Sequence, residues 1–461
     1  MRRPLWTVVI VSVATFMVGI DNMVVTNALS EIRNDLGGGA GMLTWTVNAY
    51  TLSFAVLLLT GAAFGDRYGR KRLFVVGLTA FTAASAGAAL APGMGVLIAA
   101  RAVQGVGAAI VMPLTLTLLS EAVTGPRRGA AMGAWGALSG LSVGVGPVIG
   151  GAITQYASWQ WIFWINVPIG AILLPLAIAG LTESHGGSRA IDLPGVALAS
   201  TGLTGIVYGL VRGGDVGWTS PQVLGALVAG GLLLTAFLLV EARSATPMLP
   251  LRLFRDRGFA VVNAVAFVMS FGVFGVAFLL AQFMQNVQGF SPLGAGVRML
   301  AWTAMPVIAA PVAGMLSNRL AGRWLVSAGL ALMAAGLAWI GAVLAVHVGY
   351  AVMVPGMVVA GVGMGLFFVP LSRLVLGFAP PGAAGVASGT SNTMRQLGTL
   401  MGVAVLGSVF ASAGGYATGQ SFVDGIRPAL AIAVAVLVGA VLLTLLIPSR
   451  AVAEPVLEMA A

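Results

Sequence analysis

Asp21 is well placed to do chemistry, because it lies deep inside a long apolar run. Of the 13 acidic residues, it alone falls well within such a run. An ionised carboxylate in apolar surroundings is unfavourable by several kcal/mol unless it takes up a proton or finds a partner. A group poised between these two states suits coupling to proton movement. A fixed structural ion pair, or a carboxylate nearer a helix end, is the alternative.

A second polar pair lies in another apolar run. Arg101 and Gln104 are three residues apart, so a helix places them on one face. Arginine keeps its charge in proteins, so Arg101 requires a counter-charge; a scaffold role on backbone carbonyls is the alternative. Gln104, together with Asn22 beside Asp21, is expected to contact a substrate.

Aromatic residues recur at helical spacing further along the chain. The stripe consists of Phe267, Phe271, Phe274 and Phe278 and is continued by Gln282. A helix face that is aromatic and then polar suits a cavity for amphipathic compounds. Packing against other helices or against lipid is the alternative.

The composition limits the classes of protein that remain. Hydrophobic residues make up 59% of the chain and charged residues 8%, far below the quarter or so that is typical of soluble domains. Cysteine is absent and only His185 and His347 occur, so we expect neither a metal site nor a cofactor. No nucleophile and base share an apolar run, which argues against an enzyme.

The apolar runs are long enough to cross a bilayer as helices, which takes roughly 20 residues each. Fourteen spans are predicted, and strand-like alternation is absent, so the chain is expected to be an all-α polytopic membrane protein. The spans are at roughly 5–28, 44–64, 73–91, 95–119, 131–154, 159–181, 191–211, 221–241, 259–283, 293–317, 324–345, 349–377, 385–412 and 426–447.

The net charge of +10 reflects topology and gives no indication of nucleic-acid binding. With the first residue inside the cell, 17 of the 23 basic residues fall in inner loops and ends, and the outer loops hold only Arg33, Arg212 and Arg427. This asymmetry follows the positive-inside rule. It predicts a multi-pass protein of the cytoplasmic membrane with both termini in the cytoplasm.

An internal repeat indicates two related halves. The segment GVGAAIVMPL at 105–114 recurs as GVGMGLFFVPL at 361–371. Transporters are commonly built from such repeats, which move against each other around a central site. We therefore expect a six-helix bundle at 1–187, a two-helix insert at 188–243, a second six-helix bundle at 244–450 and a short tail at 451–461.

Several longer motifs occur in a fixed order along the chain. They are GIDNMVVTNAL at 19–29, GDRYGRKR at 65–72, RAVQGVG at 101–107, GLSVGVGPVIGG at 140–151, WQWIFWINVPIG at 159–170, PMLPLRLFRDRGF at 247–259 and NTMRQLGTLMG at 392–402. Together they resemble the major facilitator superfamily, and within it the fourteen-span drug:proton antiporters. The resemblance covers nearly the whole chain.

The resemblance implies roles for specific residues. Asp21 would couple transport to protons, with Arg101 as its counter-charge. A conformational latch would consist of Gly65, Asp66, Arg67, Gly69 and Arg70. The antiporter motif would consist of Gly140, Gly144, Gly146, Pro147, Gly150 and Gly151. Small residues at this spacing allow close helix packing, and Pro147 permits a kink. Arg395 also matches the family, but the sequence does not identify its partner.

The expected function is proton-coupled export of small amphipathic compounds, such as drugs or antibiotics, by alternating access. Counting only Asp21 and Arg101, the central site is close to neutral, which favours neutral and monocationic substrates. An importer of a small solute and a lipid-moving transporter are the alternatives. The expected partners are the substrate, protons and the bilayer, and the chain is expected to be a monomer.

Overall fold

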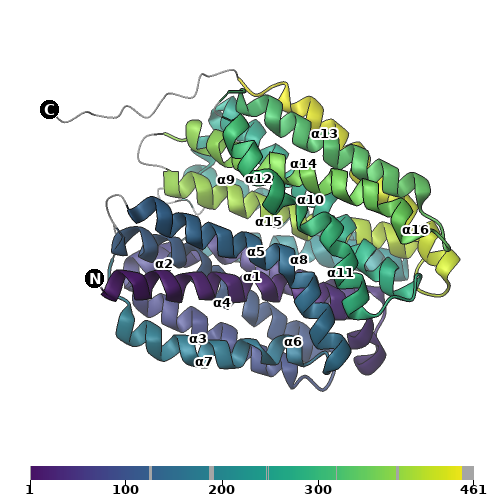
Figure 1. The fold of residues 1–461 in the computed structure, drawn as a ribbon, viewed down its shortest axis with the longest axis horizontal. Helices are drawn as coiled ribbons and strands as arrows, with labels where there is room; N and C mark the ends of the chain where they lie inside the picture. The colour runs from purple at the N-terminus through teal and green to yellow at the C-terminus, as the bar shows by residue number, and fades with distance from the viewer. Residues whose placement is uncertain are drawn as a thin grey trace.

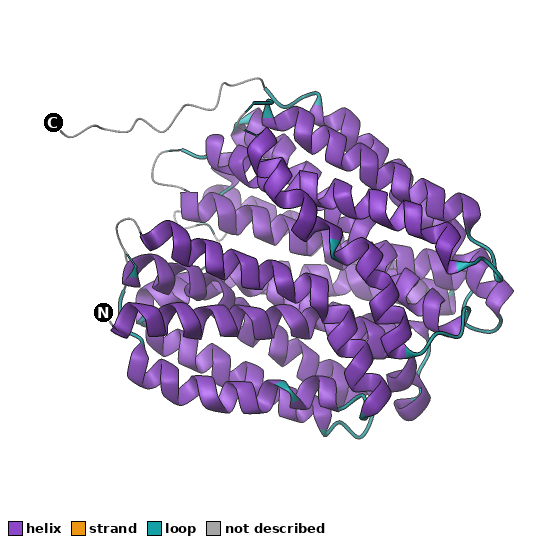
Figure 2. Cartoon of the chain, in the orientation of Figure 1, coloured by secondary structure: helices purple, strands orange, loops and turns teal. Residues whose placement is uncertain are grey.

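The computed structural model describes residues 2–123, 127–185, 192–244, 247, 249–317, 319–380 and 384–448. Within these ranges the regular elements are helices, without strands (Figure 2). The all-α prediction is confirmed for this part of the chain. The expected tail at 451–461 lies outside the described residues.

The helices follow the predicted order along the chain. The first half forms α1 (Arg2–Leu36), α2 (Ala40–Tyr68), α3 (Arg70–Ala89), α4 (Met94–Ala122), α5 (Arg127–Tyr156), α6 (Trp161–Trp164) and α7 (Asn166–Gly180). Two helices follow, α8 (Leu193–Val216) and α9 (Pro221–Arg243). After a short 3-10 helix, η1 (Leu251–Arg255), come α10 (Arg257–Asn286), α11 (Pro292–Thr303), α12 (Met305–Leu316), α13 (Gly322–Val343), α14 (Tyr350–Gly377), α15 (Ala384–Ala413) and α16 (Gly419–Thr444).

Thirteen helical stretches of the described residues are long and apolar enough to cross a membrane. Two predicted spans each consist of two helices: α6 and α7 meet at Ile165, and α11 and α12 meet at Ala304. The predicted span at 131–154 coincides with α5, where several side chains lie outside the described set. The total of fourteen therefore stays a prediction.

Helix α1 differs from its prediction in length. We expected it to end near residue 28, but it continues to Leu36. The added turns carry Glu31, Arg33 and Asp35, which water can solvate once the helix has left the apolar layer. The charged segment after residue 28 was expected to be a loop, but it forms the end of α1, which extends beyond the bilayer.

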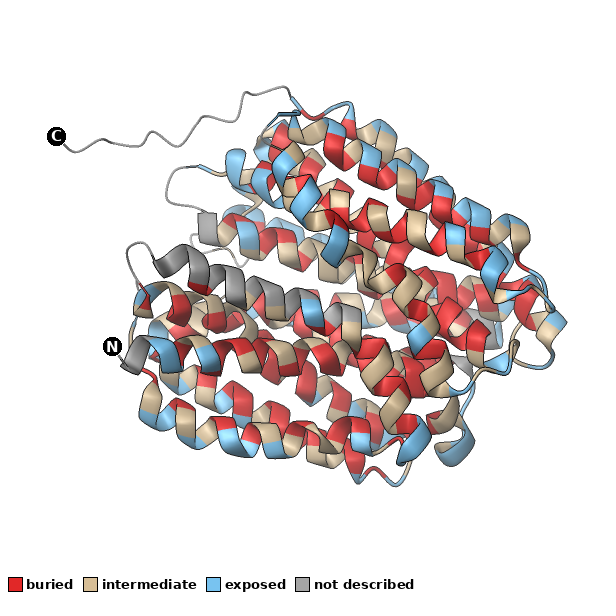
Figure 3. Ribbon diagram, viewed as in Figure 1, coloured by how far each residue is buried: buried red, intermediate tan, exposed pale blue. Residues whose placement is uncertain are grey.

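The outer surface of the bundle carries large apolar side chains. Ile172 is 62% exposed, Leu232 is 65% exposed and Ile308 is 65% exposed. Figure 3 shows such exposed positions on the outward faces of helices whose inward faces are buried. An apolar outer surface is unfavourable in water but suits the hydrocarbon of a bilayer. The chain is a multi-pass membrane protein.

The two halves repeat the same packing. In the first half α4 packs on α2 and α3, and α1 packs on α5; in the second half α14 packs on α12 and α13, and α10 packs on α15. The repeated glycines serve the same purpose in both halves. A Cβ at Gly107 would lie 2.8 Å from the Gly77 carbonyl oxygen of α3, and one at Gly363 would lie 2.5 Å from the Gly329 carbonyl oxygen of α13.

The halves meet along two helix pairs, α5 with α11 and α2 with α15. Helices α8 and α9 pack on each other, and α8 contacts both α2 and α15, so it bridges the halves. In Figure 1 the start of α1 and the end of α16 lie at the same end of the bundle. We call this the N/C end and the opposite one the distal end.

Candidate functional site

Asp21, Arg101 and Gln104 come together in the interior of the first half. Asp21 on α1 is 0% exposed and Arg101 on α4 is 1% exposed. The Arg101 Nη1 atom lies 2.6 Å from Asp21 Oδ2 and 3.1 Å from Gln104 Oε1. Gln104 donates through Nε2 to Asp21 Oδ1 at 3.1 Å. The site is thus a buried ion pair with an amide that contacts both of its charges.

Two further residues of this site were not predicted. Asn166 donates through Nδ2 to Asp21 Oδ1 at 2.8 Å and to Ser85 Oγ at 3.0 Å. Gln104 also donates to Ser85 Oγ at 3.1 Å, and Ser85 in turn donates to the Phe163 carbonyl at 2.9 Å. The break at Ile165 makes Asn166 the first residue of α7 and so turns it toward α1. In the sequence, the only indication of this role was a single asparagine within an apolar segment.

Helix α2 completes the surroundings of the Arg101 guanidinium. Arg101 Nε donates to the Thr46 carbonyl at 3.3 Å, and its Cζ lies 4.3 Å from the centre of the Tyr50 ring. The Tyr50 hydroxyl is buried and has no hydrogen-bond partner within the part of the chain that the structure describes. The cation is therefore held by a carboxylate, an amide, a carbonyl and an aromatic face, which fixes its position beneath Asp21.

The donors around Asp21 suit its ionised form. Its two oxygens accept three N–H bonds, and charge-assisted bonds of this kind are stronger than neutral ones. These bonds join Asp21 on α1 to residues of α4 and α7.

The predicted latch forms the turn between α2 and α3 at the N/C end. Gly69 has φ +105°, a value that L side chains rarely adopt. Arg70 bonds Asp66 through Nη2 at 2.7 Å and also pairs with Glu121 at the end of α4. Arg67 lies over the Tyr68 ring. A Cβ at Gly65 would lie 2.3 Å from Leu114, so this glycine allows α2 to approach α4.

Glu121 and Glu183 were not predicted as latch residues. Glu183 accepts from the Lys71 amide at 3.0 Å and from the Arg72 amide at 3.2 Å. A carboxylate in this position satisfies free amides at the start of α3 and meets the positive end of its dipole. These contacts tie α2, α3, α4 and the segment after α7 together within the first half.

The antiporter motif mediates close helix contacts. A Cβ at Gly146 would lie 2.5 Å from Met23 Cβ, and one at Gly150 would lie 2.8 Å from Val24 Cα, both on α1. A Cβ at Gly151 would lie 2.3 Å from the Pro292 carbonyl oxygen of α11. In return, one at Gly296 would lie 2.2 Å from the Pro147 carbonyl oxygen. The side-chain surroundings of Gly140 and Gly144 lie outside the described set.

The aromatic stripe on α10 divides into two parts. Phe267, Phe271 and Phe274 are half-buried, and Phe278 is packed in the core. Gln282 is buried, donates to the Phe278 carbonyl and accepts from the Tyr416 hydroxyl. Asn22 is half-buried on α1. Phe278 and Gln282 thus belong to the packed distal part, while the first three rings keep some open surface.

Polar contacts join the halves at the distal end. Gln285 donates to the Asn27 carbonyl at 2.9 Å, and Asn286 Nδ2 lies 3.2 Å from Ser30 Oγ. Arg33 Cζ lies 4.5 Å from the centre of the Tyr416 ring. Burial raises the pKa of Tyr416 above its usual value, so its hydroxyl stays protonated at neutral pH and donates to Gln282. We call Asn27, Ser30, Arg33, Gln285, Asn286 and Tyr416 the distal contacts.

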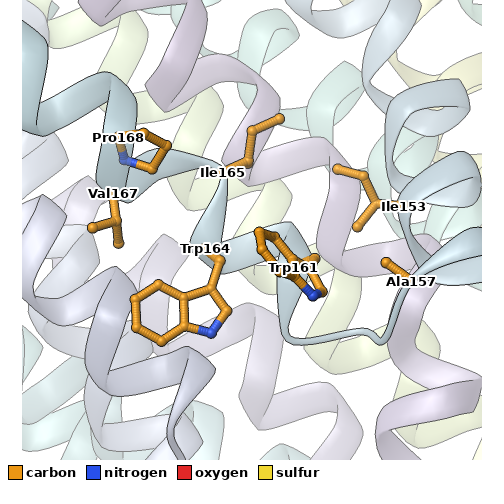
Figure 4. A pocket seen from close by; sticks show the side chains of 7 residues that line it. All are labelled: Ile153, Ala157, Trp161, Trp164, Ile165, Val167 and Pro168. Carbon is orange, nitrogen blue, oxygen red and sulfur yellow. The ribbon is translucent and has the colours of Figure 1, made fainter.

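An open pocket of about 440 Å³ lies away from Asp21, between the end of α5 and the α6–α7 segment. Its lining is almost wholly apolar and consists of Ile153, Ala157, Trp161, Trp164, Ile165, Val167 and Pro168 (Figure 4). Such a surface can hold an apolar chain but offers no carboxylate or cation. It is separate from the buried ion pair.

Comparisons with known proteins agree with this architecture. The sequence matches the Major Facilitator Superfamily over residues 11–403 and 262–459. It is 34% identical to the Multidrug resistance protein Stp of Mycobacterium tuberculosis (strain CDC 1551 / Oshkosh), over 89% of this chain and 76% of that protein. It is 35% identical to the Puromycin resistance protein pur8 of Streptomyces alboniger, over 96% of this chain and 90% of that protein.

A solved structure supports the fold alone. The bacterial homologue of the human lysosomal transporter Spinster, in an inward-facing and unoccupied conformation, superposes with a TM-score of 0.70 at 15% identity, covering 97% of each chain. With the repeated halves, the apolar outer surface and resistance proteins among its relatives, the chain belongs to the major facilitator superfamily and, within it, to the drug exporters.

Proposed function

We propose that this chain exports small amphipathic compounds in exchange for protons, by alternating access across the cytoplasmic membrane. The observation that carries the proposal is the buried Asp21–Arg101 pair. A titratable group is costly at this depth, and such groups in membrane proteins commonly mark ion pathways. The names of the relatives, which include resistance proteins, support export of drug-like compounds.

The orientation follows from charge. The N/C end carries the latch with Arg67, Arg70 and Lys71, and under the positive-inside rule this end faces the cytoplasm. Both termini are then cytoplasmic, and the distal contacts lie at the outer side. Those contacts join the halves there, so the outer side of the conformation described is closed, as an inward-facing state requires.

Both halves take part in the proposed transport cycle. In the inward-facing state Asp21 is ionised and held by Arg101, Gln104 and Asn166. Substrate enters from the cytoplasm and contacts Asn22 and the half-buried rings of α10. The halves then rock about α5–α11 and α2–α15, the distal contacts part, and the latch holds the cytoplasmic side. A proton taken up by Asp21 outside is released inside on return.

The arrangement of domains is part of the proposal. Bundles at 1–187 and 244–450 would move as rigid units, with the insert at 188–243, which contains α8 and α9, seated across the α2–α15 seam. A monomer suffices, because each chain supplies both halves. The ion pair carries no net charge, so it alone rejects neither neutral compounds nor monocations. Import of a solute and movement of lipid are the competing functions.

Transport direction and driving force test the proposal together. Everted membrane vesicles from a pump-deficient bacterium expressing the chain should accumulate ethidium when respiration acidifies their lumen. Nigericin, which dissipates the pH gradient, should release the dye. Accumulation by right-side-out vesicles under an inward proton gradient would instead indicate an importer. Accumulation that persists with a protonophore would exclude proton coupling.

A further inference from the structure

The two halves differ at the positions that hold the ion pair. In the internal repeat Gly105 corresponds to Gly361, so Arg101 corresponds to Met357 and Gln104 to Ala360. Both residues of the second half are fully buried and apolar. The second half therefore carries no copy of the α4 cation at this position, but one of its cations lies inside it on a different helix.

That cation is Arg395, which belongs to a polar face of α15. Asn392, Arg395, Gln396 and Thr399 are spaced so that a helix gathers them on one side, and all four are half-buried. The other side of α15 carries Leu397, Leu400 and Ala404, which pack with α2 and α8. The polar face is thus turned away from that seam.

The Arg395 guanidinium lacks the partners that Arg101 has. Its Cζ lies 4.8 Å from the centre of the Phe368 ring on α14, and its Nε is buried without a hydrogen-bond partner. Among the described residues no carboxylate forms an ion pair with it. Within the bilayer an arginine turned to lipid is highly unfavourable, so its free donors face the interior between the halves.

The two halves contribute different net charges to the interior between them. The Asp21–Arg101 pair sums to zero, whereas Arg395 adds one positive charge with a donor left over. The near-neutral charge expected from the sequence included only Asp21 and Arg101. With Arg395 included, the interior attracts an anionic oxygen and disfavours a substrate cation placed on the α14–α15 side.

We propose that Arg395 and Phe368 form a substrate subsite for aromatic compounds that carry an acidic oxygen, such as a carboxylate. The guanidinium donates to the oxygen, and the Phe368 ring packs on the aromatic body beside it. Phe267 and Phe271 belong to α10, whose carbonyls touch α15 at Gly398 and Gly402, so further aromatic surface lies on the adjacent helix. This subsite rests on the proposed export function and adds acidic aromatic compounds to the substrates that the neutral Asp21–Arg101 pair accepts.

Binding of matched dyes tests the subsite without any proton gradient. The purified full chain in lipid nanodiscs is titrated with one xanthene dye as its free carboxylate and as its methyl ester, using fluorescence polarisation. The wild type should bind the carboxylate about tenfold or more tightly than the ester. Arg395→Gln should lose that preference, with the ester unaffected, and Arg395→Lys should keep part of it.

The controls separate recognition from folding and from coupling. Arg427→Gln removes an arginine at the distal end that bonds the Leu344 carbonyl, and it should leave the preference intact. An equal loss of both dyes in Arg395→Gln and Arg395→Lys would show a structural role and overturn the subsite, as would a wild type without preference. Since no gradient is applied, these outcomes are independent of whether export is proton-driven.

Discussion

At the scale of single residues, Asp21 is defined by what surrounds it. Three N–H donors from α4 and α7 meet its two oxygens, and one of these donors also carries the counter-charge. Truncating Arg101 would leave the carboxylate buried without a cation, which is far more unfavourable than losing an exposed pair. Removing an amide donor leaves the ion pair in place, so such a variant tests the contribution of a neutral donor alone.

Asn166→Ala removes one donor to Asp21 while leaving the ion pair in place. The ionised carboxylate loses a bond worth about 1.5–3 kcal/mol. Proton-driven export should therefore slow several-fold, while equilibrium dye binding stays close to that of the wild type. Initial rates of ethidium export and dye binding measure the two quantities.

Asn263→Ala is the matched control, because this buried asparagine bonds the Phe259 carbonyl of its own helix in the other half. It should leave the rate of export unchanged. An unchanged rate in Asn166→Ala, or an equal loss in both variants, would contradict the role given to Asn166.

The sequence predicted Asp21, Arg101 and Gln104 of this site and missed Ser85 and Asn166. Asp21, Arg101 and Gln104 stand out because charge and amide groups are rare in apolar runs. Ser85 and Asn166 are small polar residues of a kind that also occurs at helix packing contacts. Their positions in the sequence therefore did not indicate that they belong to this site. Their role depends on the break at Ile165, which an uninterrupted apolar stretch does not disclose.

At the scale of helices, apolar length predicted the spans well and their ends poorly. The segments at 159–181 and 293–317 each appeared as one run, because both parts of each broken helix are apolar. The latch was predicted at its turn, but Glu121 and Glu183 come from distant positions and were missed. Their approach depends on how α4 and the segment after α7 return to the start of α3.

Asp66→Asn should slow turnover several-fold with little change in substrate affinity. Arg70 would keep Glu121 but lose its charged partner on α2, and the turn lies away from Asp21 and from the rings of α10. Stopped-flow transport and equilibrium dye binding separate the two quantities. Arg72→Gln is the control, since that side chain is 77% exposed and its pair with Glu183 contributes little. A loss of affinity without a rate defect would refute the latch.

Gly151→Ala should destabilise the contact between the halves. The new Cβ would lie 2.3 Å from the Pro292 carbonyl oxygen of α11, so the helices must separate, at about 1–3 kcal/mol. Thermal unfolding in detergent should show a lower midpoint. Gly231→Ala on α9 meets nothing within 4 Å and should be neutral or slightly stabilising. Equal midpoints in the two variants would contradict the close packing.

At the scale of the whole molecule, the distal end must open once in every cycle of the proposed transport. Ser30 and Asn286 face each other there from the two halves, and the chain contains no cysteine of its own. The double variant Ser30→Cys, Asn286→Cys should form a disulfide under mild oxidation and stop transport, and a reductant should restore it. Each single variant should be insensitive to oxidation. Full transport by the oxidised, cross-linked protein would exclude opening at this end.

The most direct test of proton coupling is proton movement itself, measured in proteoliposomes that contain pyranine. Wild-type protein should move protons opposite to a transported dye, and an imposed pH gradient should concentrate the dye. Asp21→Asn should abolish both effects while dye still exchanges at equilibrium, because the amide keeps the volume of the carboxyl but cannot ionise. If Asp21→Asn still concentrates the dye under a pH gradient, the coupling proton is carried elsewhere and the account is wrong.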